Sequence, residues 1–374
     1  MIDALSMSLA VTGPFTRGFL FFWIAMLVAC ISIWAYEVNT QSHNKKIEGI
    51  AYWVFGSAMV VFAFVRPMGI ARDDLPYLGI YASICPTLEC GAWIQGPRDV
   101  VWYSLVGVLK SIFATPDVML WLSATAFLIK LFLFYKLIDR PMPVLLLYTG
   151  IFYQVQDLTA WRVSLSIAAF LFAIWMVARR NNIWNGWLLF VAGFFHKQAF
   201  LAPLIMIGFY IDKYRLLLVT ACVLLLVLLS VGMFPNLHFI IDLMGDGFKQ
   251  LAVSQKFEAH FFSGQIAKAS VWPHAPIVVY PFVLLTLWLL FKSTLDQAGI
   301  LPLLSGCLFV ACVFLWVFAT YPVVQVRLFE FFMVPTVILA GIRPLKRYEM
   351  IGVVMVSGLF VAKYNIVNQI FLQP

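Results

Sequence analysis

The sequence predicts an all-α integral membrane protein with many transmembrane helices. Hydrophobic residues make up 63% of the 374 residues, charged residues make up only 11%, and the mean hydropathy is +0.95. A soluble domain has roughly 45–50% apolar and about 25% charged residues, so this chain carries more apolar surface than a water-soluble fold buries. Apolar runs near the ~20 residues that cross a bilayer recur along the chain. We therefore expect one transmembrane domain over residues 1–374.

The net charge of +8 does not indicate a nucleic-acid partner. Lys and Arg stand at the ends of apolar runs, without the basic block or aromatic-interleaved patch that follows a phosphate backbone. In membrane proteins such a distribution sets the topology, because cytoplasmic loops hold an excess of positive charge. The lipid bilayer is therefore the expected surroundings of the chain, and no nucleic acid is expected.

About twelve segments are expected to span the membrane, with both termini on the non-cytoplasmic side. They are Gly18–Tyr36, Gly49–Val65, Val118–Lys136, Val144–Val155, Trp161–Ala178, Trp184–Phe195, Ala199–Ile211, Leu216–Phe234, Pro276–Phe291, Ile300–Ala319, Leu328–Ala340 and Met350–Ile370. The short connections of one side are several-fold denser in Lys and Arg than those of the other. The positive-inside rule places that side in the cytoplasm.

The apolar stretch Val100–Ala114 decides this topology. It has only fifteen residues and contains Lys110. If it crossed the membrane, Arg179 and the later basic connections would face outward, against the positive-inside rule. We therefore expect a re-entrant or interfacial helix there, inside an outer loop of residues 66–117, and a second outer loop over residues 235–275.

The densest polar stretch follows the second expected span, from Phe64 to Tyr81. Six of its side chains are charged residues or tyrosines: Arg66, Arg72, Asp73, Asp74, Tyr77 and Tyr81. The topology brings further polar residues to the outer ends of spans: Asp157, Arg162, His196, Lys197 and Arg327. This convergence predicts one outward-facing site.

Three of these residues, Arg66, Arg162 and Arg327, are arginines embedded in apolar sequence. An arginine at the edge of a span is costly unless it is paired or needed, although any one of them has the structural alternative of snorkelling to the interface. A guanidinium binds phosphate oxygens through two parallel hydrogen bonds and stays charged in a low dielectric. We expect the arginines to hold a lipid-linked diphosphate. The other residues expected at this diphosphate and sugar site are Arg72, Asp74, Tyr77, Asp157 and Lys197.

His196 lies between two short apolar segments, in GFFHKQAFL. A lone histidine of this kind is more often a satisfied core or interfacial side chain than a catalyst. A break between two short helices at the outer face is also where a general base meets an acceptor hydroxyl. We predict that His196 is the catalytic base, with Asp73 as the competing candidate.

The carboxylates of Asp73, Asp74 and Asp157 have a second interpretation as ion-pair partners of Arg72 and Arg162. The sequence contains no DxD, no HExxH and no zinc-like Cys/His spacing. We therefore expect neither a metal ion nor a cofactor.

Cys85 and Cys90 lie in the expected outer loop, whereas the other four cysteines lie in apolar spans. In an oxidising compartment a disulfide can close the short ring CPTLEC, and it stabilises modestly because the loop is short. We hypothesise that this disulfide forms.

Four segments, in this order, resemble motifs of EpsG-like and Wzy-type bacterial polysaccharide polymerases. RPMGIARDDLPY is similar to the R-x-x-G-x-D-x-x-x-Y element after their second span, with two extra residues between Gly69 and Asp73. LTAWRVSLS resembles the start of a central span through Arg162, and FFHKQAFL resembles a helix break through His196. VQVRLFEFF is similar to a late R-x-x-x-Y/F element through Arg327. The likeness covers about residues 49–340.

The resemblance implies a metal-independent glycosyltransferase with a GT-C-like arrangement of membrane helices. Such enzymes join undecaprenyl-diphosphate-linked repeat units into O-antigen, capsule or exopolysaccharide at the periplasmic face of the bacterial inner membrane. Lipid-linked glycans are then the implied donor and acceptor, and a chain-length regulator protein is an implied partner.

Other functions stay open. An O-antigen ligase shares the chemistry and differs in its acceptor. A lipid-linked oligosaccharide flippase also needs cationic cavity residues, but these would lie at mid-membrane on several helices instead of at one face. A solute transporter is less favoured, since no pair of Gly- or Pro-broken segments recurs in two halves.

Overall fold

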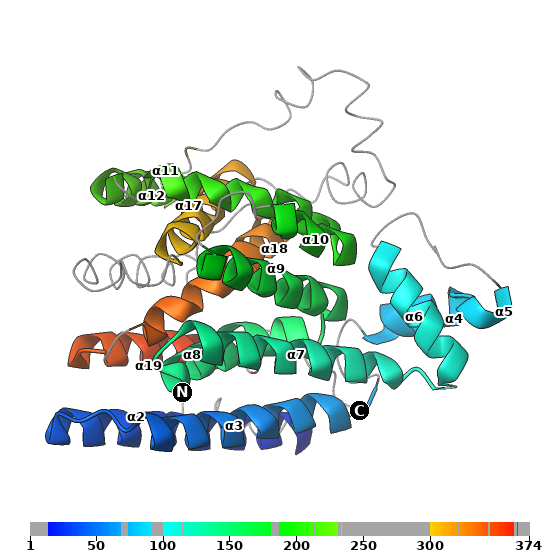
Figure 1. Cartoon of the computed structure of the whole chain (residues 1–374), viewed down its shortest axis with the longest axis horizontal. Helices are drawn as coiled ribbons and strands as arrows, with labels where there is room; N and C mark the ends of the chain where they lie inside the picture. Colours follow the sequence, from blue (N-terminus) through cyan, green and yellow to red (C-terminus); the bar gives the residue numbers. More distant parts are fainter. Residues whose placement is uncertain are drawn as a thin grey trace, which may run out of the picture. The chain divides into compact units, whose positions relative to one another are not determined.

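The computed structural model describes the chain as helical (Figure 1). The described residues are 14–68, 74–90, 100–113, 115–180, 187–211, 214–230, 233, 300–319, 322–342, 345–362 and 365, and every regular element in them is a helix. The all-α class expected from the sequence is confirmed for these residues. The chain divides into two compact units, residues 1–203 with 337–374 and residues 204–336. The expectation of a single transmembrane domain stays a prediction.

The first unit holds most of the described helices. They are α2 (Pro14–Thr40), α3 (Lys45–Val65), α4 (Asp74–Ser83), α5 (Thr87–Cys90), α6 (Val100–Ile112), α7 (Val118–Leu137), α8 (Pro141–Tyr148), the π-helix η1 (Thr149–Asp157), α9 (Trp161–Arg180), α10 (Leu188–Phe195) and α19 (Arg347–Ala362). Two 3-10 helices, η3 (Lys197–Ile207) and η6 (Val334–Gly341), run across the boundary between the units in sequence.

Four described helices are long and apolar enough to cross a membrane, namely those over Phe15–Thr40, Lys45–Val65, Val118–Leu137 and Trp161–Arg179. Each coincides with an expected span. The expected span Val144–Val155 is the middle of a longer helical stretch, α8 with η1, over residues 141–157. The segment expected to be re-entrant or interfacial forms the 13-residue helix α6, and its position in the membrane stays a prediction. The total of about twelve spans and the GT-C-like arrangement stay predictions, and the long loop 235–275 lies outside the described residues.

Helix ends follow the local sequence. The side chain of Asn44 caps α3 by accepting a hydrogen bond from the backbone N–H of Ile47 at 3.1 Å. The helix ends at Arg66 because a residue that precedes proline is driven into the extended region, and Arg66 has φ −62° and ψ 142°. At the start of α8 the first position is Pro141, whose missing N–H would have no partner there in any case.

The helical path breaks at His196, as expected. This residue is extended, with φ −154° and ψ 126°, between the end of α10 and the start of η3. Gly193 allows the two segments to approach, because a Cβ at that position would lie only 2.4 Å from Cδ1 of Phe200. The break therefore depends on a small residue one turn before it.

Helix α7 packs against both α3 and α9. The phenol of the buried Tyr52 on α3 donates to the carbonyl of Leu131 on α7 at 2.7 Å. One turn later Gly56 receives the Leu131 side chain, since a Cβ there would lie 2.9 Å from Cδ1 of the leucine. Small residues let membrane helices approach closely, so these contacts fix α3 against α7 over two turns.

Three connections of the first unit meet at one end of its helices. Lys45 forms an ion pair with Asp139 at 2.7 Å, and the backbone N–H of Arg140 donates to the carbonyl of Gly341 at 2.9 Å. The indole of Trp34 donates to the carbonyl of Leu345 at 2.9 Å. These are the connections that the charge distribution assigns to a common, cytoplasmic side, and the structure brings them together.

The second unit contains α11 (Gly208–Ile211), α12 (Arg215–Ser230), α17 (Leu301–Val317) and α18 (Pro322–Met333). Its backbones approach closely at glycines. A Cβ at Gly208 would lie 1.7 Å from the carbonyl oxygen of Pro302, and one at Gly306 would lie 1.9 Å from that of Ile205. This small-residue contact is typical of helices that pack within a membrane.

The grouping of connections predicts which positions react from outside the cell. Lys45 and Thr115 are both exposed, at opposite ends of the membrane helices. In intact cells a membrane-impermeant thiol reagent is expected to label Thr115→Cys and to label Lys45→Cys only after permeabilisation. Labelling of Lys45→Cys in intact cells at the rate of Thr115→Cys would reverse the assigned orientation.

Candidate active site

A fully buried ion pair joins the two ends of the polar stretch after α3. Nη1 of Arg66 donates to Oδ2 of Asp74 at 2.7 Å, and Nη2 donates to Oδ1 at 2.6 Å. Both side chains are 0% exposed. The parallel bonds use the guanidinium fork in full. Arg66 therefore fixes the start of α4 against the end of α3.

This pairing differs from the ion pairs expected from the sequence. The second interpretation of Asp74 paired it with Arg72 or Arg162, but it opens α4 and so faces Arg66 at the end of the preceding helix. The role of Arg66 and Asp74 as ligands of substrate stays a prediction, and the observed role of both is to hold this turn closed.

Aromatic rings lie against Arg66 and Arg162 in the first unit. Tyr77 stacks on Trp161 with ring centroids 4.4 Å apart and packs against Trp102 at 5.6 Å. The Arg66 guanidinium lies 5.5 Å from the Trp161 ring. That of Arg162 lies 5.6 Å from both the Tyr77 and the Trp102 ring. We call the rings of Tyr77, Trp102 and Trp161 the aromatic frame.

The aromatic frame restrains Arg162 at the first turn of α9, where its side chain is half-buried. A cation over the face of Tyr or Trp is attracted by the ring quadrupole, by about 0.5–2 kcal/mol for each contact. Two such contacts orient the guanidinium plane. Arg162 is thus held in one place with a chemistry suited to an anion.

His196 lies at the same end of the helices as Arg162. Helices α9 and α10 pack together, and Ser166 Oγ on α9 donates to the carbonyl of Ala192 on α10 at 2.8 Å. Arg162 precedes Ser166 by four residues on α9, and His196 follows Ala192 by four residues at the end of α10. Because the two helices run antiparallel, Arg162 and His196 lie at the same height along the helix axes. The adjacent Phe195 packs against the core that contains the aromatic frame. His196 itself is buried.

The segment between α3 and α7 is tied down by three contacts. Lys110 Nζ on α6 donates to the carbonyls of Tyr81 and Ile84, both at 2.7 Å, which caps the end of α4 with a positive charge. The Tyr81 phenol donates to the carbonyl of Phe113 at 3.0 Å, and burial raises its pKa, so it remains a protonated donor. A disulfide joins Cys85 and Cys90, whose Cα atoms are 6.2 Å apart.

A second buried pair lies below this end, inside the span α7. Lys130 Nζ donates to Oδ1 of Asp157 at 2.6 Å, and both side chains are 0% exposed. The same carboxylate accepts a hydrogen bond from the phenol of Tyr148 at 2.5 Å and another from the hydroxyl of Ser164. Lys130 also donates to Tyr148 at 2.9 Å and to Ser164 at 3.0 Å. Every oxygen of Asp157 is therefore occupied by the protein.

Asp157 was expected at the diphosphate and sugar site or as an ion-pair partner of Arg72 or Arg162. Its ion-pair partner is Lys130, and its role at the substrate stays a prediction. The π-helical turn that ends at Asp157 directs the carboxylate toward the middle of α7. The sequence analysis missed Lys130, although the signal was there: a lysine at the centre of an apolar span needs a buried partner. Lys130 on α7 bonds to Asp157 at the end of η1 and to Ser164 on α9, so the pair holds η1 and α9 against α7.

The remaining predicted site residues are only partly placed. Arg72 and Asp73 lie outside the described residues, as does the side chain of Lys197. Arg327 is exposed on α18 in the second unit. Their roles at the site stay predictions. In the described part of the chain, the side chains close enough to hold a metal ion together are Glu37, His43 and Glu48, at the other end of α3.

Comparison with known families agrees with this arrangement. A family model described as the EpsG family matches residues 49–372. The chain belongs to the EpsG family. The matched range contains the aromatic frame, both buried ion pairs and His196, so the family resemblance seen in the sequence is confirmed. Membership of the EpsG family implies a role of the polysaccharide-polymerase type in a membrane. No curated protein and no solved structure matches the chain.

The Arg66–Asp74 pair generates a stability prediction for this EpsG-family protein. Removing one partner of a buried pair leaves an uncompensated charge and costs about 3–5 kcal/mol, whereas replacing both with apolar residues is often neutral. Arg66→Ala is expected to lower the melting temperature of the detergent-solubilised protein strongly, and the double variant Arg66→Met, Asp74→Leu is expected to recover most of the loss.

Glu89→Gln provides the control, because Glu89 is an exposed carboxylate on the next short helix, α5. The melting temperature of every variant is measured from the monodisperse fraction that remains in size-exclusion chromatography after heating. Glu89→Gln should have the melting temperature of the unaltered protein. A double variant no more stable than Arg66→Ala would show that the pair is not what holds this turn.

Proposed function

We propose that this protein is a glycosyltransferase that polymerises lipid-diphosphate-linked oligosaccharide repeat units into a long surface polysaccharide. The lipid is undecaprenol, the membrane is the bacterial inner membrane, and the site faces the periplasm. Family membership supports the polymerase role. The placement of Arg162 and His196 at one end of the membrane helices supports a site for glycosyl transfer at that end.

The observation that carries the proposal is the Arg162 guanidinium over the aromatic frame. The leaving group of the reaction is a diphosphate, which gains negative charge as the sugar departs. A preoriented guanidinium stabilises that charge best in the transition state, in a site of low dielectric. It supplies the positive charge that a metal ion supplies in other transferases, so we propose a metal-independent reaction.

The acceptor is activated from the neighbouring segment. A hydroxyl of the acceptor sugar attacks the anomeric carbon of the donor, the bond from that carbon to the phosphate oxygen breaks, and the lipid diphosphate leaves. The hydroxyl proton passes to a base. His196 takes this role in our proposal, because it lies at the level of Arg162 and because the ordinary pKa of histidine, about 6.5, is near the working pH. Asp73 remains the competing base.

The other polar residues have supporting roles. The Arg66–Asp74 pair and the Lys110 cap hold α4 and α6 against the start of α9. Tyr77 then contributes through the aromatic frame, by orienting Arg162. Arg72, Lys197 and Arg327 are proposed as further ligands of the diphosphate. A chain-length regulator protein is the proposed partner in the membrane.

The buried Lys130 is the observation that bears on the flippase alternative. A flippase needs cationic residues in a cavity at mid-membrane, and Lys130 is at that depth. However, Lys130 and Asp157 are fully buried and satisfy each other together with Tyr148 and Ser164. A saturated pair is a structural anchor, so the polymerase is preferred. An O-antigen ligase would use the same donor and differ in its acceptor.

The role of Arg162 predicts a defect in chain length without loss of protein. In a cell that depends on this protein, Arg162→Ala is expected to abolish long polymer, and Arg162→Lys is expected to rescue poorly because lysine lacks the planar fork. Arg179→Ala is the matched control, since Arg179 is exposed at the other end of α9. The polysaccharide ladder on a gel is the measurement, at matched membrane abundance. A wild-type ladder from Arg162→Ala would refute the role.

The base assignment predicts different pH profiles for two variants. His196→Ala is expected to reduce polymerisation from purified lipid-linked repeat units by about 10²–10⁴-fold and to remove the low-pH limb of the rate profile. Asp73→Asn is expected to retain that limb. If His196→Ala keeps near-wild-type turnover while Asp73→Asn is inactive, the base is the carboxylate.

A further inference from the structure

A second polar cluster lies at the opposite end of α3 from the aromatic frame. It consists of Glu37 at the end of α2, His43 in the connection, Glu48 in the first turn of α3, and Arg140 before α8. Glu48 and Arg66 are 18 positions apart on α3, which corresponds to roughly 27 Å along a helix. The proposed glycosyl transfer uses none of these residues.

Three potential metal ligands converge in this cluster. Nδ1 of His43 lies 2.5 Å from Oε1 of Glu37 and 3.6 Å from Oε2 of Glu48. The three ligand atoms all lie within 4.8 Å of one another. Ligand atoms of a tetrahedral Zn²⁺ site, with bonds of about 2.0–2.1 Å, are roughly 3.3 Å apart. The separations here bracket that value.

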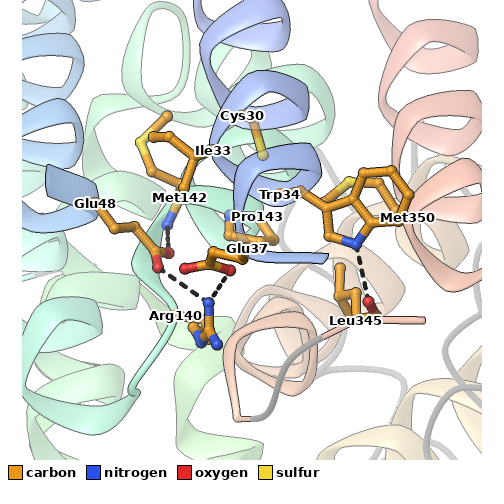
Figure 2. Close-up of a pocket in the computed structure, with 10 residues that line it drawn as sticks. All are labelled: Cys30, Ile33, Trp34, Glu37, Glu48, Arg140, Met142, Pro143, Leu345 and Met350. Atoms are coloured by element: carbon orange, nitrogen blue, oxygen red, sulfur yellow. Dashed lines mark hydrogen bonds and ion pairs between the residues drawn. The ribbon is translucent and has the colours of Figure 1, made fainter. Parts of the chain in front are cut away.

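The other oxygen of each carboxylate is held by the protein. Nη1 of Arg140 donates to Oε2 of Glu37, and the backbone N–H of Met142 donates to Oε1 of Glu48 at 3.1 Å. Figure 2 shows both carboxylates turned toward the Arg140 guanidinium. Contacts of this kind orient ligands in metal sites, where ligating carboxylates are themselves hydrogen-bonded. Each glutamate thus presents its second oxygen to His43.

One of these oxygens lacks a hydrogen bond. Glu48 is 2% exposed, and no hydrogen-bond donor in the described ranges reaches its Oε2, whose nearest cations are Nδ1 of His43 at 3.6 Å and Nη1 of Arg140 at 3.7 Å. A buried carboxylate oxygen in that state is costly. Glu37 and Glu48 are among the residues that line a cavity of about 20 Å³, together with Cys30 and Trp34 (Figure 2). This volume accommodates one ion or one water molecule, and no sugar or nucleotide.

We propose that Glu37, His43 and Glu48 bind one first-row divalent transition-metal ion, with Zn²⁺ as the best fit. An imidazole and two carboxylates suit Zn²⁺ or Mn²⁺ better than Ca²⁺ or Mg²⁺, which take oxygen ligands throughout. Arg140 offsets one of the two carboxylate charges. The ion replaces the proton between His43 and Glu37, and a water in the cavity completes four ligands.

Such an ion would clip the end of α2 to the start of α3. The same end of the unit holds the Lys45–Asp139 pair and the Trp34–Leu345 bond. A metal clip there stabilises the connections on the side that we assign to the cytoplasm. It takes no part in glycosyl transfer, and its test does not depend on polymerase activity.

The test is metal binding by the purified, full-length protein after treatment with EDTA and removal of any affinity tag. Titration calorimetry with Zn²⁺, followed by dialysis and elemental analysis, should give one ion per chain and a rise in melting temperature. His43→Asn and Glu48→Gln should each weaken binding by more than about a hundredfold. Asp139 is an exposed carboxylate at the same end of the unit. The Asp139→Asn variant should bind Zn²⁺ with the affinity of the unaltered protein.

Two outcomes overturn the site. One is the absence of saturable Zn²⁺ binding and of Mn²⁺ binding to the unaltered protein. The other is unchanged affinity in His43→Asn. Loss of the buried Glu48 charge can impair folding, so the decisive comparison uses His43→Asn. The His43 side chain is 17% exposed. Monodisperse elution is checked for every variant.

Discussion

The first unit is built around charges that the bilayer would not tolerate alone. Lys130 and Asp157 neutralise each other within the span α7, and Arg66 and Asp74 do so at the end of α3. A charged group loses its hydration in such a place, and only a close partner with further hydrogen bonds compensates. Each pair therefore joins elements that are distant in sequence. The first joins α7 to η1 and α9, and the second joins α3 to α4.

The candidate site follows from these two anchors. Asp157 and Ser164 fix the start of α9 relative to α7, which sets the height of Trp161 and Arg162. Asp74 fixes the start of α4, which brings Tyr77 onto Trp161. The aromatic frame is thus assembled from elements that each anchor positions separately. Arg162 lies against two of these rings at the first turn of α9. This preorientation is why we assign the diphosphate to it.

Much of this arrangement was readable in the sequence, and the limits have physical causes. Apolar run lengths gave four spans that match the structure, including the end of α3 at Val65, and the polar break gave His196. Pairing was not readable, because Asp74 has two arginines within eight residues and burial decides between them. Lys130 was not predicted because it stands alone inside an apolar run and its partner Asp157 is 27 residues away in the sequence. The Glu37–His43–Glu48 cluster was overlooked because its ligands follow no metal-binding spacing and converge only through a helix turn.

The most direct test of the account is a cryo-electron microscopy map of the protein in a lipid nanodisc with its lipid-diphosphate-linked repeat unit bound. The account predicts density for the diphosphate against the Arg162 guanidinium, with the acceptor side of the first sugar toward His196 and the Arg66–Asp74 pair intact. Density for the diphosphate at the Glu37 end of α3, or beside Lys130 with its pair to Asp157 broken, would contradict it.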